Sequence, residues 1–107
     1  YASIVFIFVK GVRMGRLENV YELEAYDIDK SGDDRLEECA IFGSYESAFN
    51  SKDDFLKDIT DEDETITGLL EEISKGDGYY YASYGYVTKN GTPGTKIVRI
   101  NKRVVNY

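Results

Sequence analysis

The hexapeptide Ile-Val-Phe-Ile-Phe-Val at residues 4–9 decides the fold that this sequence predicts. Both alternating sets of its side chains are apolar, so a strand formed here has no face that suits water. β-Branched and aromatic residues favour a strand over a buried helix, and Gly11 follows shortly after the run. We therefore expect a central strand whose two faces are covered by the rest of the chain.

The length and composition of the chain limit its class. A chain of 107 residues is the size of one domain, so we predict a single α+β domain over residues 1–107. The longest apolar run is far shorter than the roughly 20 residues that span a bilayer. We expect a cytoplasmic protein that makes no membrane contact.

The residues that the chain lacks restrict its chemistry. It has no histidine, and Cys39 is its single cysteine, which excludes an internal disulfide, a thiolate zinc cluster and the commonest general base. Cys39 also follows two glutamates, and nearby negative charge raises the pKa of a thiol and makes it a poor nucleophile. We therefore expect no enzymatic activity and no cofactor.

Acidic and basic residues are segregated along the chain. All 20 acidic residues lie between Glu18 and Asp77, where five basic residues oppose them, and the charged residues on either side of this block are all basic. The net charge is −7. If the two ends pair in one sheet, the folded domain has a basic pole and an acidic pole.

Residues 17–28 and 36–42 alternate well enough to form a second and a third strand, and the segment between them carries oxygen ligands at regular spacing. Asp27, Asp29 and Ser31 stand at positions one, three and five, and Glu38 stands at position twelve. With a backbone carbonyl from Asp33, this spacing resembles an EF-hand calcium loop. The resemblance covers residues 27–38 and implies that these five residues bind calcium.

The same segment also suits a hairpin turn at residues 29–34, because Gly, Asp and Ser favour turns. Asp34 places a charge where an EF-hand carries an apolar anchor, and the residues before Asp27 make a poor amphipathic helix. These features favour a hairpin, and calcium binding is the lesser alternative.

Two helices are expected in the middle of the chain. Ser44 can cap a short helical turn, and Ser51 then opens a helix that buries Phe55, Leu56 and Ile59. The second helix is predicted over residues 60–75, because apolar side chains recur there at i, i+3, i+4 and i+7. These apolar residues are Ile66, Leu69, Leu70 and Ile73.

An acidic run opens the second predicted helix and is a candidate contact for a partner. It consists of Asp61, Glu62, Asp63 and Glu64. Acids at a helix N-terminus already have an electrostatic reason to be there, so a solvated helix start is the competing interpretation. Metal binding is a weaker one, because consecutive acids point around a helix.

Residues 79–87 and 97–105 predict a C-terminal hairpin, whose connection contains the turn dipeptides Asn-Gly and Pro-Gly. The hairpin combines aromatic and cationic side chains, a mixture that suits single-stranded nucleic acid as well as protein interfaces. The candidate binding residues are Tyr80, Tyr84, Tyr86, Arg99 and Arg103.

These elements predict a five-stranded, mostly antiparallel sheet in the order β-β-β-α-α-β-β, with two helices packed on one face. The expected function is that of a small acidic, non-catalytic binding protein that acts by contact with another protein, as inhibitors, immunity proteins and phage antagonists do. The expected partner has a basic surface. A nucleic-acid-binding module is the alternative, and self-association stays open because two helices leave sheet surface exposed.

Overall fold

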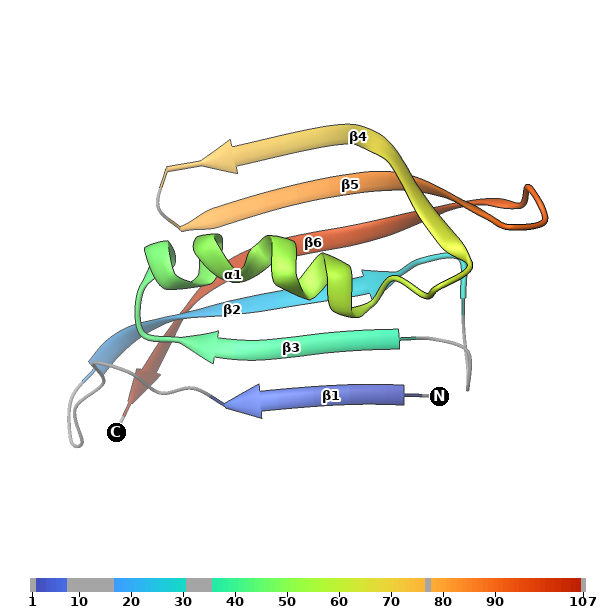
Figure 1. Ribbon diagram of the computed structural model, residues 1–107. Coiled ribbons are helices and arrows are strands. Elements are labelled where there is room, and N and C mark those ends of the chain that lie inside the picture. Colours follow the sequence, from blue (N-terminus) through green and yellow to red (C-terminus); the bar gives the residue numbers. More distant parts are fainter. Residues whose placement is uncertain (1, 8–16, 31–35, 77, 107) are drawn as a thin grey trace.

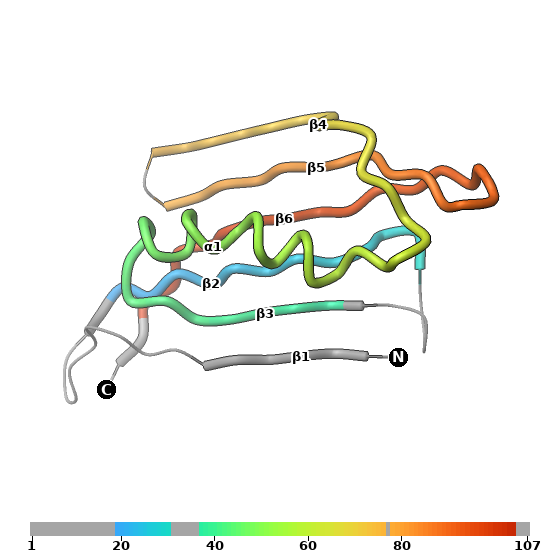
Figure 2. Tube along the Cα trace, viewed as in Figure 1, coloured from blue at the N-terminus to red at the C-terminus, as the bar shows by residue number. Residues whose placement is uncertain are grey.

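The computed structural model describes residues 2–7, 17–30, 36–76 and 78–106 (Figures 1 and 2). Within these ranges the chain forms six strands and one helix. The elements are β1 Ala2–Ile7, β2 Leu17–Asp27, β3 Leu36–Phe42, α1 Tyr45–Asp58, β4 Glu64–Lys75, β5 Tyr79–Thr88 and β6 Pro93–Asn106.

The six strands form one sheet in the order β1-β3-β2-β6-β5-β4. β1 runs parallel to β3, and every other neighbouring pair is antiparallel. Helix α1 lies across one face of this sheet, where it contacts β2, β6 and β3 (Figure 1). The α+β content agrees with the sequence, but the predicted layout of five strands under two helices is wrong.

The second predicted helix is strand β4. Its pairing with β5 shifts between Ile66 and Gly68 and again between Leu69 and Glu71, and each shift marks a bulge that inserts one extra residue. Two insertions break the period of two that a regular strand shows, so apolar residues recur along β4 at a helix-like spacing. Thr60, the first residue of the predicted helix, instead closes the end of α1, where its hydroxyl donates to the Leu56 carbonyl (2.6 Å).

Strand β1 lies at an edge of the sheet, so the expected central position of residues 4–9 is wrong. The long central ladder joins β2 to β6 from Leu17 opposite Asn106 to Asp27 opposite Lys96. A strand's place depends on which distant segments pair with it, and the apolar content of the strand alone does not settle that. Phe8 and Val9 lie outside the described residues.

The main core lies between α1 and the sheet. Alternate residues of β2, β5 and β6 face the helix and are almost completely buried, among them Leu23, Tyr80 and Ile100, and they pack against Ala48 and Phe55 of α1. This face of the sheet carries the apolar set of each strand. The other alternating set, which includes several charged residues, lies on the opposite face.

Helix α1 begins earlier than the sequence predicts. Ser44 caps it by accepting a hydrogen bond from the backbone N–H of Ser47 (3.1 Å). Ser51, the expected cap, lies inside the helix, where its hydroxyl donates to the Ser47 carbonyl (2.9 Å). The expected short turn and the expected helix are therefore one helix of 14 residues, which places Asp54 and Asp58 one turn apart.

Candidate functional site

The structure separates the tyrosines and arginines that the sequence grouped in the C-terminal hairpin. Tyr80, Tyr84 and Tyr86 lie on the helix-facing side of β5, where Tyr80 and Tyr86 are buried. The Tyr80 hydroxyl donates to a carboxylate oxygen of Glu72 (2.6 Å). Tyr80 and Tyr86 are thus part of the packed interior, and Tyr84 packs half-buried against it, so the three rings do not form an exposed surface for stacking on bases.

Arg99 and Arg103 lie on the opposite face of the sheet, and both are paired. The Arg99 guanidinium lies 2.7 Å from a carboxylate oxygen of Glu24, and that of Arg103 lies 3.0 Å from Glu22. Arg99 also lies over the ring of Tyr26 at 5.7 Å. Because strands from distant parts of the chain bring these acids to the arginines, the basic end of the sequence does not form a basic surface here.

A group of four charges, buried except for the half-buried Lys30, holds the start of β4 against the sheet, and we call it the lysine cluster. Its members are Asp27, Lys30, Glu64 and Lys96. Lys96 has a fully buried side chain whose ammonium group lies 3.0 Å from Asp27 and 2.8 Å from Glu64. It also donates to the Ile59 carbonyl at the end of α1 (3.1 Å).

The predicted acidic patch is divided by this cluster. Glu64 points inward to Lys96 and Lys30, while Asp61, Glu62 and Asp63 remain exposed. Burial favours a higher pKa for Glu64, but hydrogen bonds from Lys30 and Lys96 outweigh it and lower that pKa. One of the four predicted contact residues is therefore part of the fold.

The residues expected to bind calcium are also dispersed or engaged. The carboxylate of Asp27 binds Lys96 and accepts a hydrogen bond from the Asp29 backbone N–H (2.8 Å). The Asp29 carboxylate accepts from the backbone N–H of Thr95. Asp27 ends β2 and Glu38 lies within β3, its antiparallel neighbour, while Ser31 and Asp33 lie outside the described residues.

A second set of acids lies near this region. Carboxylate oxygens of Asp61, Asp63 and Glu64 all lie within 4.8 Å of one another. Glu64 already accepts from Lys30 and from the Asp61 backbone N–H (2.9 Å). Because Lys30 and Lys96 neutralise the Glu64 carboxylate, the three acids together have little attraction for a further cation.

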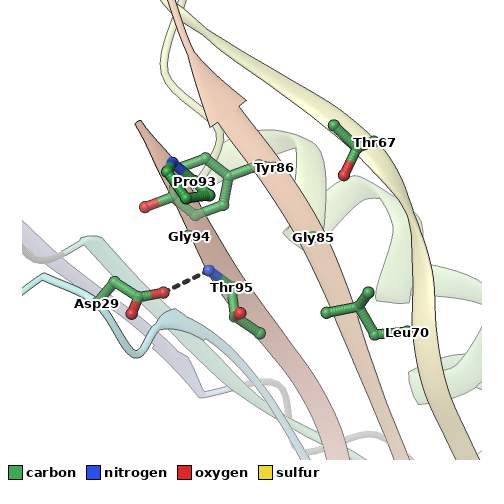
Figure 3. Close-up of a pocket in the computed structure, with 8 residues that line it drawn as sticks. All are labelled: Asp29, Thr67, Leu70, Gly85, Tyr86, Pro93, Gly94 and Thr95. Atoms are coloured by element: carbon green, nitrogen blue, oxygen red, sulfur yellow. Dashed lines mark hydrogen bonds between the residues drawn. The ribbon is translucent and has the colours of Figure 1, made fainter. Parts of the chain in front are cut away.

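A shallow depression of about 450 Å³ lies where β4, β5 and β6 meet the end of β2 (Figure 3). Its lining combines apolar groups of Leu70 and Pro93 with the hydroxyl groups of Thr67, Tyr86 and Thr95. The carboxylate of Asp29 reaches the rim, where it is held by the Thr95 N–H (Figure 3). The only carboxylate in this lining is therefore already engaged within the fold.

Glu38 on β3 lies near two acids of α1, Asp54 and Asp58, and we call these three residues the Glu38 cluster. Glu38, on β3, is only 5% exposed, and its Oε2 atom has no hydrogen-bond partner among the described residues. The carboxylates of Asp58 and Asp54 on α1 act on the Glu38 carboxyl as nearby acids. Burial first, and then these two acids, raise the pKa of Glu38 to about 7.

The sequence reading assigned Glu38 to the calcium loop and did not single out Asp54 or Asp58. The spacing of these two acids was the available signal, because residues four apart share one face of a helix. That signal alone could not place Glu38 beside the helix, because the packing of α1 on β3 joins distant parts of the chain.

Cys39 is half-buried on the sheet face opposite α1. Burial raises its pKa to about 11, and the charges of Glu22, Glu24 and Glu37 act in the same direction. The prediction that this thiol is a poor nucleophile is thereby supported, although Cys39 does not belong to the helix-facing core.

Comparisons with known proteins give no family for this chain. A scan against family models, a search of curated proteins and a search of solved structures each found no match. In the part of the chain that the structure describes, no helix is both long enough and apolar enough to cross a membrane.

Proposed function

We propose that this chain is a non-catalytic binding protein that contacts a basic surface of another protein. The contact is made by the outer side of α1 and the turn that follows it, which we call the acidic helix surface. Within residues 45–63, seven acidic side chains are exposed, and Lys57 is the one exposed basic side chain. These acids are Glu46, Asp53, Asp54, Asp58, Asp61, Glu62 and Asp63.

The distribution of the positive charges supports this proposal. Lys30, Lys96, Arg99 and Arg103 are each engaged by carboxylates within the fold. Lys52, on α1 itself, lies over the ring of Phe49 at 4.0 Å. The excess negative charge therefore accumulates on the helix side, where it attracts a basic partner over long range.

A nucleic-acid partner has less support from the same observations. Phosphates would have to approach a chain of net charge −7, and the two arginines proposed to meet them already bind Glu24 and Glu22. The tyrosines proposed to stack on bases lie on the other face of the sheet. Affinity for nucleic acid depends mainly on free cationic side chains.

Binding of a fluorescently labelled octa-arginine peptide, followed by anisotropy at low and at physiological salt, tests the proposal. Asp53→Lys should weaken binding about fivefold, as expected for a loss of about 1 kcal/mol at an exposed charge. Glu71→Lys is the matched control, because it changes the net charge equally from an exposed position on β4. It should change the affinity by less than about twofold, because an exposed charge away from the contact is largely screened by salt.

Equal weakening by both variants would mean that the peptide senses only net charge and would contradict a defined acidic helix surface. A labelled single-stranded DNA should stay unbound at low salt. Salt-sensitive DNA binding that Arg99→Ala abolishes would replace the proposal with the nucleic-acid alternative.

A further inference from the structure

Strand β4 forms an open edge of the sheet. In the order β1-β3-β2-β6-β5-β4 it pairs with β5 on one side, and no other strand of the described residues pairs with its outer side (Figure 1). Helix α1 packs on β2, β6 and β3, so β4 lies beyond the main contact of the helix. An edge strand presents backbone N–H and C=O groups that can pair with a further strand.

The second half of β4 is regular and exposed. Both register shifts come before Glu71, and residues 71–75 pair with β5 without interruption. Proteins commonly protect an edge with proline or with bulges, but this segment contains no proline and lies beyond the bulges. Every residue from 69 to 75 is exposed, so the segment is accessible for pairing. Its large apolar side chains are Leu69, Leu70 and Ile73.

Glu71, Ile73 and Lys75 lie on the face of the sheet opposite α1. Glu72 lies on the helix side, because its carboxylate accepts from the hydroxyl of Tyr80, which belongs to the core beneath α1. Successive residues of a strand point to opposite faces. The open face of this edge therefore carries an acid, an apolar side chain and a base, each two residues from the next.

We propose that two copies of this chain associate through β4 in an antiparallel ladder centred on Ile73, which joins their sheets into one. A two-fold axis through Ile73 places this residue opposite its own copy. The same axis places Glu71 opposite Lys75 of the second copy, and symmetry repeats this pair on the other side. Opposite charges that face each other across antiparallel strands stabilise the pairing.

The charges of β4 select this register among the symmetric ones. An axis through Glu71, Glu72 or Lys75 would place a charged residue opposite its own copy, and like charges across a ladder are destabilising. An axis through Ser74 would form no charge pair within residues 71–75. Only the axis through Ile73 brings opposite charges together in this segment.

The charge of the surrounding surface also favours the β4 edge over the helix as a contact between copies. Residues 65–75 contain two acids and one base, whereas the acidic helix surface has seven exposed acids and one exposed lysine. Two copies of an acidic chain repel each other over long range. Association through β4 therefore brings less like charge together than association through α1.

Analytical ultracentrifugation of the native chain from micromolar to millimolar concentration tests the proposal. We expect a weak equilibrium between monomer and dimer, because a short ladder buries less than the roughly 1,200 Å² of stable complexes. Glu71→Lys and Lys75→Glu should each weaken the dimer about tenfold, since each replaces two attractive pairs with two repulsive ones. Glu71→Lys also reduces the net negative charge, which by itself would strengthen association.

A charge swap is the matched control for this register. In the double variant Glu71→Lys/Lys75→Glu each reversed charge again faces its opposite, so the affinity should return to within about twofold of the native value. An equimolar mixture of the two single variants should form a mixed dimer more readily than either variant alone. Failure of both the double variant and the mixture to recover association would contradict the register.

Amide NMR signals locate the contact. As the protein concentration rises, the signals of residues 71–75 should shift, while those of α1 stay in place. The proposal is overturned if the native chain remains monomeric at millimolar concentration, if the single variants associate as well as the native chain does, or if the shifts centre on another element.

This inference goes beyond the proposed contact with a basic protein, and either can fail without the other. Glu71→Lys should weaken the dimer and leave octa-arginine binding nearly unchanged. Asp53→Lys, at an exposed position on α1, changes the net charge equally and should do the reverse.

Discussion

The lysine cluster and the Glu38 cluster both lie where α1 meets the sheet, but they differ in charge balance. The first pairs acids with lysines, whereas the second consists of acids alone. In the first, Lys96 is enclosed between Asp27 and Glu64 at 3.0 and 2.8 Å. In the second, Glu38 is equally buried and lies near the acids of α1. One cluster contains its own counterions, and in the other the raised pKa of Glu38 favours its protonated form.

This contrast separates acids that maintain the fold from an acid that weakens it when ionised. A carboxylate that is matched internally contributes to the folded state only while its lysine remains. A buried carboxylate left unmatched costs stability. The buried acids of this chain therefore fall into two classes that substitution can distinguish.

Removal of the central lysine should have the largest effect. Lys96→Met leaves Asp27 and Glu64 buried without their main cation, and loss of one partner of a buried ion pair costs about 3–5 kcal/mol. Urea denaturation should show this loss in the free energy of unfolding. Lys57→Met, at an exposed position on α1, should change the same quantity by less than about 0.5 kcal/mol. Similar losses in the two variants would show that the lysine cluster does not maintain the fold.

Neutralisation of Glu38 should act in the opposite direction. Its pKa is raised to about 7 in the folded chain, so the folded state binds this proton more tightly than the unfolded state does. Stability from this group is complete below the unfolded pKa of about 4.3 and is lost as the pH rises through 7. Glu38→Gln should therefore stabilise the chain by on the order of 2 kcal/mol at about pH 8.

This gain should shrink as the pH falls and vanish near about pH 4, where Glu38 is protonated in both states. Urea denaturation of both proteins over this range measures the difference. A constant difference at every pH would mean that Glu38 is not held in its protonated form by its neighbours.

Local pattern identified most of the strands correctly. The ranges 17–28, 36–42, 79–87 and 97–105 correspond to β2, β3, β5 and β6, because regular alternation and turn dipeptides are properties of neighbouring residues. β4 was mistaken for a helix since its two bulges imitate a helical spacing. The edge position of β1 depends on pairing between distant segments, which alternation does not encode.

The candidate sites were harder to predict, for the same physical reason. Glu64 reads as one of four consecutive exposed acids, yet it is buried by Lys96 and Lys30 from other parts of the chain. Arg99 reads as free positive charge, yet it is paired with Glu24 across the β2–β6 ladder. Residue type indicates what a side chain can do, and the register of the sheet decides whether its charge is already used.

The smallest expected effect concerns the exposed counterpart of the lysine cluster. The Glu24–Arg99 pair is short at 2.7 Å, but the Arg99 side chain is 41% exposed. Water and salt screen such pairs, so a double-mutant cycle with Glu24→Ala and Arg99→Ala should give a coupling of about 0.2–1 kcal/mol. The coupling should fall further in high salt, unlike the loss caused by Lys96→Met. A coupling above about 2 kcal/mol would remove the distinction between exposed and buried pairs and make the open face of the sheet a second charge network that maintains the fold.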